Sequence, residues 1–257
     1  MTSKPLILVT NDDGITAPGL RSLIRLMSAL GDVVVVAPDK PQSAMGHAIT
    51  VNNTLYVDRH TALEDGALEE YSTSGTPSDC VKLALNEILD RRPDLCVSGI
   101  NHGSNSAINV IYSGTMSAAI EAGIEGIPAI GFSLCDFKWE ADFSAFEPFV
   151  TKITKEALEK KIPPGVILNV NAPNIKEIKG IKICRQAKSN WREKFDKRTN
   201  PMGKEYYWLS GEFDLQDKGE DTDEWALANG YISIVPTQFD LTAHHSIQTI
   251  NNWDLNE

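Results

Sequence analysis

The feature that most limits how this chain can fold is a regular alternation of short apolar runs and amphipathic stretches in its first 135 residues. The apolar runs are rich in β-branched residues, and their length suits strands that are covered on both faces. They lie at residues 6–10, 33–36, 94–99 and 128–134. Stretches with the apolar spacing of one helix face separate them, at about residues 20–30, 76–88 and 115–125. This alternation predicts right-handed βαβ units, and therefore a parallel sheet with helices on both faces.

The rest of the chain is less regular. Its patterns favour an amphipathic helix at 143–160, a strand at 165–170, a short strand at 231–235, a closing helix at 241–253, and a hairpin or edge excursion around 50–58. Between about 190 and 223, charges, glycines and aromatic residues mix without a helical period, which is typical of an extended arm. We therefore expect one α/β domain over 1–257. Its three-layer α/β/α core, with a mostly parallel, Rossmann-like sheet, would span about 1–187, and a β-rich and helical arm about 188–257.

Composition and charge narrow the functional classes. The chain has 257 residues, 42% of them hydrophobic, which is enough to bury a sizeable core. The net charge of −11 argues against tight nonspecific binding to nucleic acid or to an anionic membrane. No apolar run approaches the ~20 residues of a membrane helix, and no signal peptide is predicted. The four cysteines are widely spaced, so we expect buried free thiols and a cytoplasmic protein.

The first predicted strand runs directly into two adjacent acidic residues, in the stretch LILVTNDDGITAPGL. The carboxylates of Asp12 and Asp13 repel each other, so a cation, a phosphorylation switch or solvent must offset their charge. In an open parallel sheet, ligands bind beyond the carboxyl ends of the strands. The segments after the other predicted strands belong to the same edge, and they carry Ser43 after the second strand and Asn101 and Asn105 after residues 94–99.

These residue types suit a hard divalent cation beside a phosphate. Carboxylates, a serine hydroxyl and an asparagine carbonyl are oxygen ligands that Mg²⁺ or Mn²⁺ prefers. The segment Ser113-Gly114-Thr115 opens the next predicted helix, whose free backbone N–H groups and positive dipole end can hold a phosphate. Gly114 would let an anion approach the backbone closely. A cation beside such a helix start predicts phosphoryl transfer.

Plainer interpretations stay open for each residue taken alone. The acidic pair can be a helix cap or a solvated turn, and the segment 113–115 can be only an N-cap. His47 and His102 fit a supporting role at the site as well as they fit loop structure. Asp240 and His244 are four residues apart and would face each other on a helix, so we expect a structural pair.

Two other families of phosphate-handling proteins also place acidic residues after a first strand. Receiver domains of response regulators need a phosphorylatable aspartate after a later strand, but here residues 95–99 are followed by Ile100 and Asn101. Haloacid-dehalogenase-type phosphatases place the second acid two residues after the nucleophile, whereas Asp12 and Asp13 are adjacent. The spacing therefore disfavours both families.

The ordered motifs of this chain resemble those of the SurE family, the stationary-phase survival proteins. From Leu6 to His245 they are NDDG followed by APG, APD-x-x-x-S, GTP-x-DCV, SGIN-x-G-x-N, IYSGT-x-x-AA-x-E and DLTAH. Members of this family are metal-dependent 5′/3′-nucleotidases, and some also act on short polyphosphate. The resemblance implies a three-layer α/β core with an arm that reaches a neighbouring subunit.

Carried over by motif, the resemblance also assigns roles to individual residues. It implies one divalent cation per subunit, Mg²⁺ or Mn²⁺, held by Asp12, Asp13, Ser43 and Asn101. It implies that the substrate phosphate is bound by Asn105, Ser113, Gly114 and Thr115. Asp12 or Asp13 would serve catalysis by activating water.

The function expected from these residues is hydrolysis of nucleoside 5′- and 3′-monophosphates to nucleoside and phosphate. The family's arm implies a homodimer or a homotetramer. Two alternatives stay open at this point: a regulator that binds nucleotide or phosphate without turnover, and a phosphatase for a non-nucleotide ester.

Overall fold

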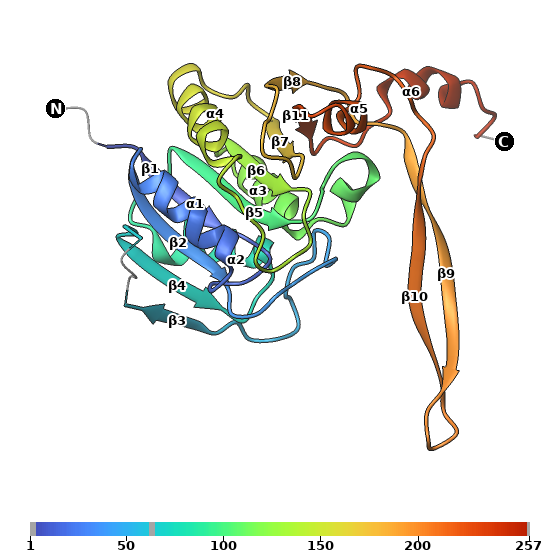
Figure 1. Cartoon of the computed structure of the whole chain (residues 1–257), viewed down its shortest axis with the longest axis horizontal. Coiled ribbons are helices and arrows are strands. Elements are labelled where there is room, and N and C mark those ends of the chain that lie inside the picture. Colours follow the sequence, from blue (N-terminus) through green and yellow to red (C-terminus); the bar gives the residue numbers. More distant parts are fainter. Residues whose placement is uncertain (1–3, 62–64, 256–257) are drawn as a thin grey trace.

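A central mixed β-sheet organises the molecule (Figure 1). The computed structural model describes residues 4–61 and 65–255. Within these residues the sheet has nine strands in the order β3-β4-β2-β1-β5-β6-β7-β11-β8. Their bounds are β1 Leu6–Thr10, β2 Asp32–Pro38, β3 Val57–His60, β4 Glu69–Thr73, β5 Leu95–His102, β6 Ala129–Leu134, β7 Val166–Ala172, β8 Ile181–Ile183 and β11 Ile232–Gln238.

The centre of the sheet is parallel, and antiparallel pairs occur near its two ends. The strands from β4 through β2, β1, β5 and β6 to β7 pair in parallel. β3 runs antiparallel to β4, and β11 runs antiparallel to β7. The prediction of a mostly parallel three-layer α/β fold is confirmed.

Helices cover both faces of the sheet and separate two apolar cores. Along β1, Ile7 and Val9 face the core formed with α1 (Pro18–Ser28) and α4 (Glu147–Lys160). Leu6 and Leu8 face the opposite core, formed with α2 (Pro77–Leu83) and α3 (Gly114–Ile124). Because both faces of the strand are buried, its sequence is a continuous apolar run rather than an alternation.

The predicted helix at 76–88 is present, but its second half widens. Thr76 and Asp79 form a reciprocal capping box at the start of α2. The chain then continues from Ala84 to Ile88 as a π-helical turn. Around 50–58 the prediction was only partly right, because β3 begins at Val57 and pairs with β4, a strand that the sequence pattern did not indicate. The sequence of β4, EEYST, has no apolar run, because its buried positions are polar residues, namely Glu70, Ser72 and Thr73.

A long antiparallel hairpin leaves the body of the molecule (Figure 1). It consists of β9 (Ser189–Thr199) and β10 (Glu205–Leu215). After the hairpin, α5 (Asp223–Ala228) leads into β11, which lies in the main sheet between β7 and β8, and α6 (His244–Asn251) follows. The segment after residue 188 therefore has one part outside the sheet and one strand within it, and its division from the core as an arm stays a prediction.

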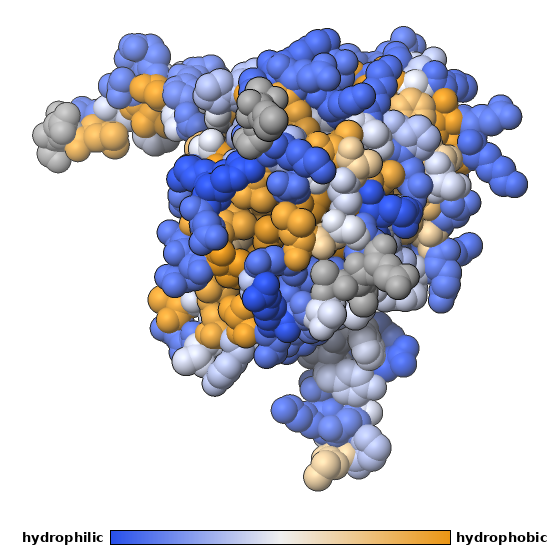
Figure 2. Space-filling view, turned by 90° about the vertical axis from the view of Figure 1, so that its left-hand side faces the viewer, coloured by the Kyte–Doolittle hydropathy of each residue, from blue (hydrophilic) through white to orange (hydrophobic). Residues whose placement is uncertain are grey.

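The surface is mostly polar but not uniformly so. Viewed from the left-hand side of Figure 1, it shows an apolar area bordered by charged and polar residues (Figure 2). Among the described residues, no helix has both the length and the apolar character needed to cross a bilayer.

Candidate functional site

A cleft of about 290 Å³ lies beyond the carboxyl ends of β1 and β5, beside the start of α3. Its lining includes six of the residues predicted from the sequence, namely Asp12, Asp13, Ser43, Asn101, Asn105 and Ser113. The other two, Gly114 and Thr115, lie directly behind the cleft and contact Asp12. All eight predicted residues are thus brought together at one edge of the sheet.

The turn after β1 sets the direction of the two aspartates. Asn11 closes it with its side chain: Nδ2 donates to the Gly14 carbonyl at 2.9 Å, and Oδ1 accepts from the Gly14 N–H at 3.2 Å. Gly14 adopts a positive φ of 98°, which a residue with a side chain rarely does. The Gln42 N–H donates to the Asp12 carbonyl at 2.8 Å, so the turn also holds the loop that carries Ser43.

Asp12 is buried against the first turn of α3. The Thr115 hydroxyl donates to Asp12 Oδ1 at 2.6 Å. A Cβ added at Gly114 would lie only 2.6 Å from Asp12 Cβ, so glycine is what permits this close approach. Burial, together with the neighbouring charge of Asp13, raises the pKa of Asp12 to about 7, although the Thr115 hydrogen bond opposes this.

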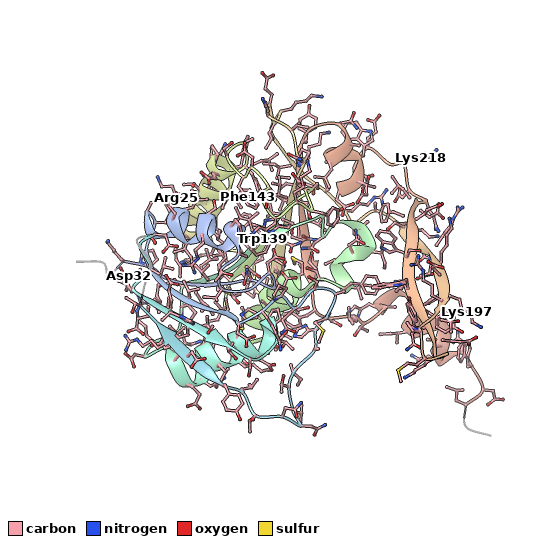
Figure 3. All side chains as sticks on the ribbon, turned by 60° about the horizontal axis from the view of Figure 1, so that its bottom comes forward. Arg25, Asp32, Trp139, Phe143, Lys197 and Lys218 are labelled. Carbon is pink, nitrogen blue, oxygen red and sulfur yellow. The ribbon has the colours of Figure 1, made fainter. Side chains whose placement is uncertain are left out.

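Asp13 is held by His102, which the sequence left between a supporting role and loop structure. Asp13 Oδ2 lies 2.9 Å from His102 Nδ1 and accepts from the His102 backbone N–H at 3.2 Å. The imidazole stacks on Trp139 and meets the edge of Phe143, and both rings lie on the same side of the molecule (Figure 3). Burial lowers the pKa of His102, but the hydrogen bond and charge of Asp13 outweigh it and raise that pKa overall. His102 therefore orients Asp13.

The two asparagines are fixed by different contacts. Asn101 Nδ2 donates to the Gly103 carbonyl at 2.9 Å, which turns the amide nitrogen to the backbone and makes the oxygen available as a ligand. Asn105 belongs to a buried polar network: its Nδ2 donates to Ser133 Oγ and its backbone N–H to Asn171 Oδ1, each at 2.8 Å. Asn169 Nδ2 donates to the Asn105 carbonyl at 2.9 Å. Sequence reasoning missed these β7 asparagines, although polar residues within the apolar strand VILNVNA signalled them.

The exposed loop that carries Ser43 is held in place by contacts with α2 and α3. His47 Nε2 lies 2.7 Å from Glu121 Oε2, and Lys82 Nζ donates to the other carboxylate oxygen at 2.6 Å. Burial favours a higher pKa for Glu121, but the bonds to His47 and Lys82 hold that pKa below its usual range. Further along the loop, the backbone and hydroxyl of Thr50 donate to Asp79 at 3.0 and 2.6 Å. His47 therefore has both of the roles that the sequence left open: it holds the structure of the loop, and that loop lines the cleft.

Ser113 acts as the N-cap that the sequence suggested. Its Oγ accepts from the Met116 N–H at 3.0 Å, and Ser113 also lines the cleft. The first N–H groups of α3 have no carbonyl partner within the helix, as at any helix start. This end of α3 therefore faces the cleft with an electropositive backbone, next to Asp12.

The donor set fits a hard divalent cation. Its candidate ligands are all oxygens, from two carboxylates, a hydroxyl and an amide, and the carboxylates lie side by side where a positive charge would relieve their repulsion. Among residues 4–61 and 65–255, no three His, Cys, Asp or Glu side chains cluster as a metal site, so hydroxyl and amide oxygens would have to complete the coordination. No Lys or Arg among the described residues lines the cleft.

The pair predicted near the end of the chain lies elsewhere. His244 Nε2 is 3.2 Å from Asp240 Oδ2, and both side chains are exposed. Neither belongs to the described lining of the cleft.

Comparisons with known proteins agree with the motifs. The family model described as survival protein SurE matches residues 7–193. The 5′-nucleotidase SurE of Flavobacterium psychrophilum is 71% identical over 257 residues, covering 99% of this chain and 100% of the relative. That of Bacteroides fragilis is 50% identical over 253 residues, covering 98% of each chain. The crystal structure of the SurE protein from Aquifex aeolicus is 40% identical, with a TM-score of 0.82 over 96% of this chain and 98% of that one.

Proposed function

Because this chain belongs to the SurE family, we propose that it hydrolyses nucleoside monophosphates to nucleoside and phosphate. The observation that carries the proposal is the juxtaposition of two carboxylates, further oxygen donors and the start of α3 in one cleft. Relatives that match over nearly the whole chain bear the name 5′-nucleotidase SurE, which supports a hydrolase of phosphoric monoesters.

One divalent cation per subunit, Mg²⁺ or Mn²⁺, is part of the proposal. Asp12, Asp13, Ser43 and Asn101 would hold it, since they supply the oxygen donors of the cleft. When bound, the cation supplies Lewis-acid polarisation of the phosphoryl group and activation of water.

The chain's own residues would then arrange the reaction. Backbone N–H groups at Gly114 and Thr115 would take up negative charge that develops on the phosphoryl oxygens. Asn105, held rigid by its amide network, would orient the phosphate. Asp12 and Asp13 remain the candidates for accepting the proton of the attacking water, and His102 keeps Asp13 in place.

A substrate panel tests this function. Purified protein would be incubated with 5′-AMP, 3′-AMP and simple sugar phosphates, with Mg²⁺ or Mn²⁺ and in parallel with EDTA, and released phosphate measured. We expect metal-dependent release from the nucleotides that EDTA abolishes. Tight binding of AMP without release would instead establish a regulator, and faster turnover of the sugar phosphates a phosphatase for another ester.

Assembly, location and a second substrate are further parts of the proposal. We propose a homodimer or homotetramer joined through the segment after residue 188, because the hairpin exposes Phe195, Tyr207 and Trp208 away from the body. Light scattering that finds only monomer at micromolar concentration would contradict this. Four free cysteines support a reducing, cytoplasmic location. Short polyphosphate as a second substrate stays a prediction from the family.

A further inference from the structure

The cleft described above continues into a second, larger cavity at the base of the hairpin. This cavity has a volume of about 450 Å³ and is lined in part by Glu193, Leu209 and Ser210 of β9 and β10. It shares four lining residues with the cleft, namely Ala44, Asn109, Tyr112 and Trp191. The two spaces therefore meet at a common wall that contains two aromatic side chains.

The hairpin side of this wall is built into the fold. Trp191 Nε1 donates to Asn109 Oδ1 at 2.9 Å, and its ring meets the edge of the Phe213 ring at a centroid distance of 5.5 Å. The Ile108 N–H donates to Ser189 Oγ at 3.2 Å. These contacts attach the base of β9 to the short helix Ala107–Ile111 that precedes α3, and the two segments lie side by side in Figure 3. These contacts hold the wall of the cavity in place.

The chemistry of the wall suits a flat aromatic ligand. Tyr112 is 51% exposed and Leu209 is 65% exposed, and most of the surface they share with Trp191 is carbon. Aromatic side chains with open faces bind nucleobases by stacking. Sites of this kind, apolar with a few polar groups, are the usual pockets for the organic part of a ligand.

The position of the second cavity relative to the start of α3 indicates which part of a substrate it would hold. Tyr112 directly precedes Ser113, the cap of the helix whose first N–H groups face the cleft. Tyr112 lines both the cleft and the second cavity, so the second cavity adjoins the end of the cleft at which the helix starts. The second cavity is the continuation of the cleft on this side.

We infer that the second cavity binds the nucleoside part of the substrate, with the base against Tyr112 and the wall formed by Trp191. The inference rests on the proposed function and adds that the hairpin, besides any role in assembly, forms part of the substrate site. Its competitor within the cleft is Phe137, an aromatic residue that is 83% exposed and packs beside Gly103. Phe137 lines the first cleft but not the second cavity, so it serves as a matched control.

The test compares Tyr112→Ala, Tyr112→Phe and Phe137→Ala on AMP and on ribose 5-phosphate, which lacks the base. Loss of one stacking partner corresponds to about a tenfold effect or more. We expect Tyr112→Ala to lower kcat/KM for AMP about tenfold relative to ribose 5-phosphate, Tyr112→Phe to restore it, and Phe137→Ala to leave the ratio unchanged. An equal loss on both substrates in Tyr112→Ala, or a larger base-dependent loss in Phe137→Ala, overturns the inference.

Calorimetric titration of AMP keeps this test separate from that of the proposed function. If the wild-type protein releases no phosphate from any substrate, the hydrolase proposal fails, but AMP binding can still be measured. Weaker AMP binding in Tyr112→Ala than in Phe137→Ala, with unchanged affinity for inorganic phosphate, supports the nucleoside site. Equal AMP affinity in all variants refutes it.

Discussion

Gly114→Ala tests whether the close approach of Asp12 to α3 is essential to the site. Gly114 is the first residue of α3, where alanine would normally favour the helix by roughly 0.5–1 kcal/mol. Here the added methyl group would lie 2.6 Å from Asp12 Cβ, 2.9 Å from Oδ2 and 3.0 Å from Cγ. Two of the three atoms belong to the stem and carbon of a buried carboxylate, so they cannot swing aside as a flexible chain end would.

The size of the effect follows from the displacement. An ordinary contact begins near 3.4 Å, so the Asp12 side chain or the start of α3 must move by nearly one ångström from the present 2.6 Å. A misplacement of about 1 Å can reduce catalysis about a hundredfold, which equals about 2.7 kcal/mol of transition-state stabilisation. We therefore expect kcat/KM for AMP to fall about a hundredfold. Mn²⁺ affinity, measured by calorimetry, should fall too, because Asp12 is a proposed ligand.

Gly123→Ala is the matched control, because it makes the same substitution in the same helix. Its added methyl group would lie 2.9 Å from Cγ1 and from Cδ1 of the buried Ile167 side chain, so it also forces a small shift, but one that lies away from the residues lining the cleft. We expect this variant to keep its activity and Mn²⁺ affinity, with far-UV circular dichroism confirming that both variants fold. Wild-type turnover and Mn²⁺ binding in Gly114→Ala would show that the site does not need Asp12 in this position.

Three further variants probe other contacts of the site. Asp12→Asn should stay folded but lose the rise in melting temperature that Mn²⁺ gives the wild-type protein; full turnover with Mg²⁺ would contradict its role as a ligand. Glu121→Gln should weaken Mn²⁺ binding several-fold and cost about 1–3 kcal/mol of stability in urea, because His47 and Lys82 lose their carboxylate partner. The hydrogen bonds from Thr50 and Thr76 outweigh burial and lower the pKa of Asp79, so its carboxylate stabilises the fold above about pH 4 and less as the pH falls further. Asp79→Asn should thus be about 1 kcal/mol less stable at pH 7, and urea titrations at successively lower pH should show this deficit shrinking once the pH falls below about 4.

The sequence predicted the centre of the fold better than its edges, for a physical reason. A strand such as β1 is buried on both faces, so its five residues leave a continuous apolar record, and its predicted bounds match the structure. β4 pairs with β2 on one side and with the exposed β3 on the other. It carries charge even at a buried position, because Glu70 is paired with Arg21 at 2.9 Å, and so no apolar run marks the strand. The long hairpin left only a mixture of charged and aromatic residues, because its strands pair with each other away from any core.

The sequence predicted the candidate metal ligands, which follow strands, but it did not predict the side chains that hold those ligands and their loop in place. Asp12, Asp13 and Asn101 follow or end strands of a parallel sheet, and topology alone brings them to one edge. The bond of His102 to Asp13 links residues 89 positions apart. That of Glu121 to His47 links residues 74 positions apart. Such pairings depend on how elements pack, which one sequence does not reveal, so both histidines stayed ambiguous.

The charge of the cleft leads to a last prediction, that cation and phosphate bind cooperatively. Asp12 and Asp13 line the cleft, no Lys or Arg among the described residues does, and His102 is engaged with Asp13. A phosphate about 4 Å from a carboxylate is opposed by roughly 4 kcal/mol per pair of unit charges at an effective dielectric constant of 20, more than a helix start offsets. A divalent cation reverses this balance, so phosphate affinity should rise at least tenfold when Mg²⁺ is present, within the usual coupling of about 1–3 kcal/mol.

Linkage requires that phosphate raise the affinity for Mg²⁺ by the same factor. Four calorimetric titrations, each ligand with and without the other, measure both factors once ion pairing in solution is subtracted. Asp13→Asn should bind phosphate more tightly than the wild-type protein in EDTA, because one repulsion is gone, and should show weaker coupling. Phosphate binding that is equally tight in EDTA and in Mg²⁺ would mean that the cleft neutralises its own carboxylates, and the cation would then have no electrostatic reason to share the site with the substrate.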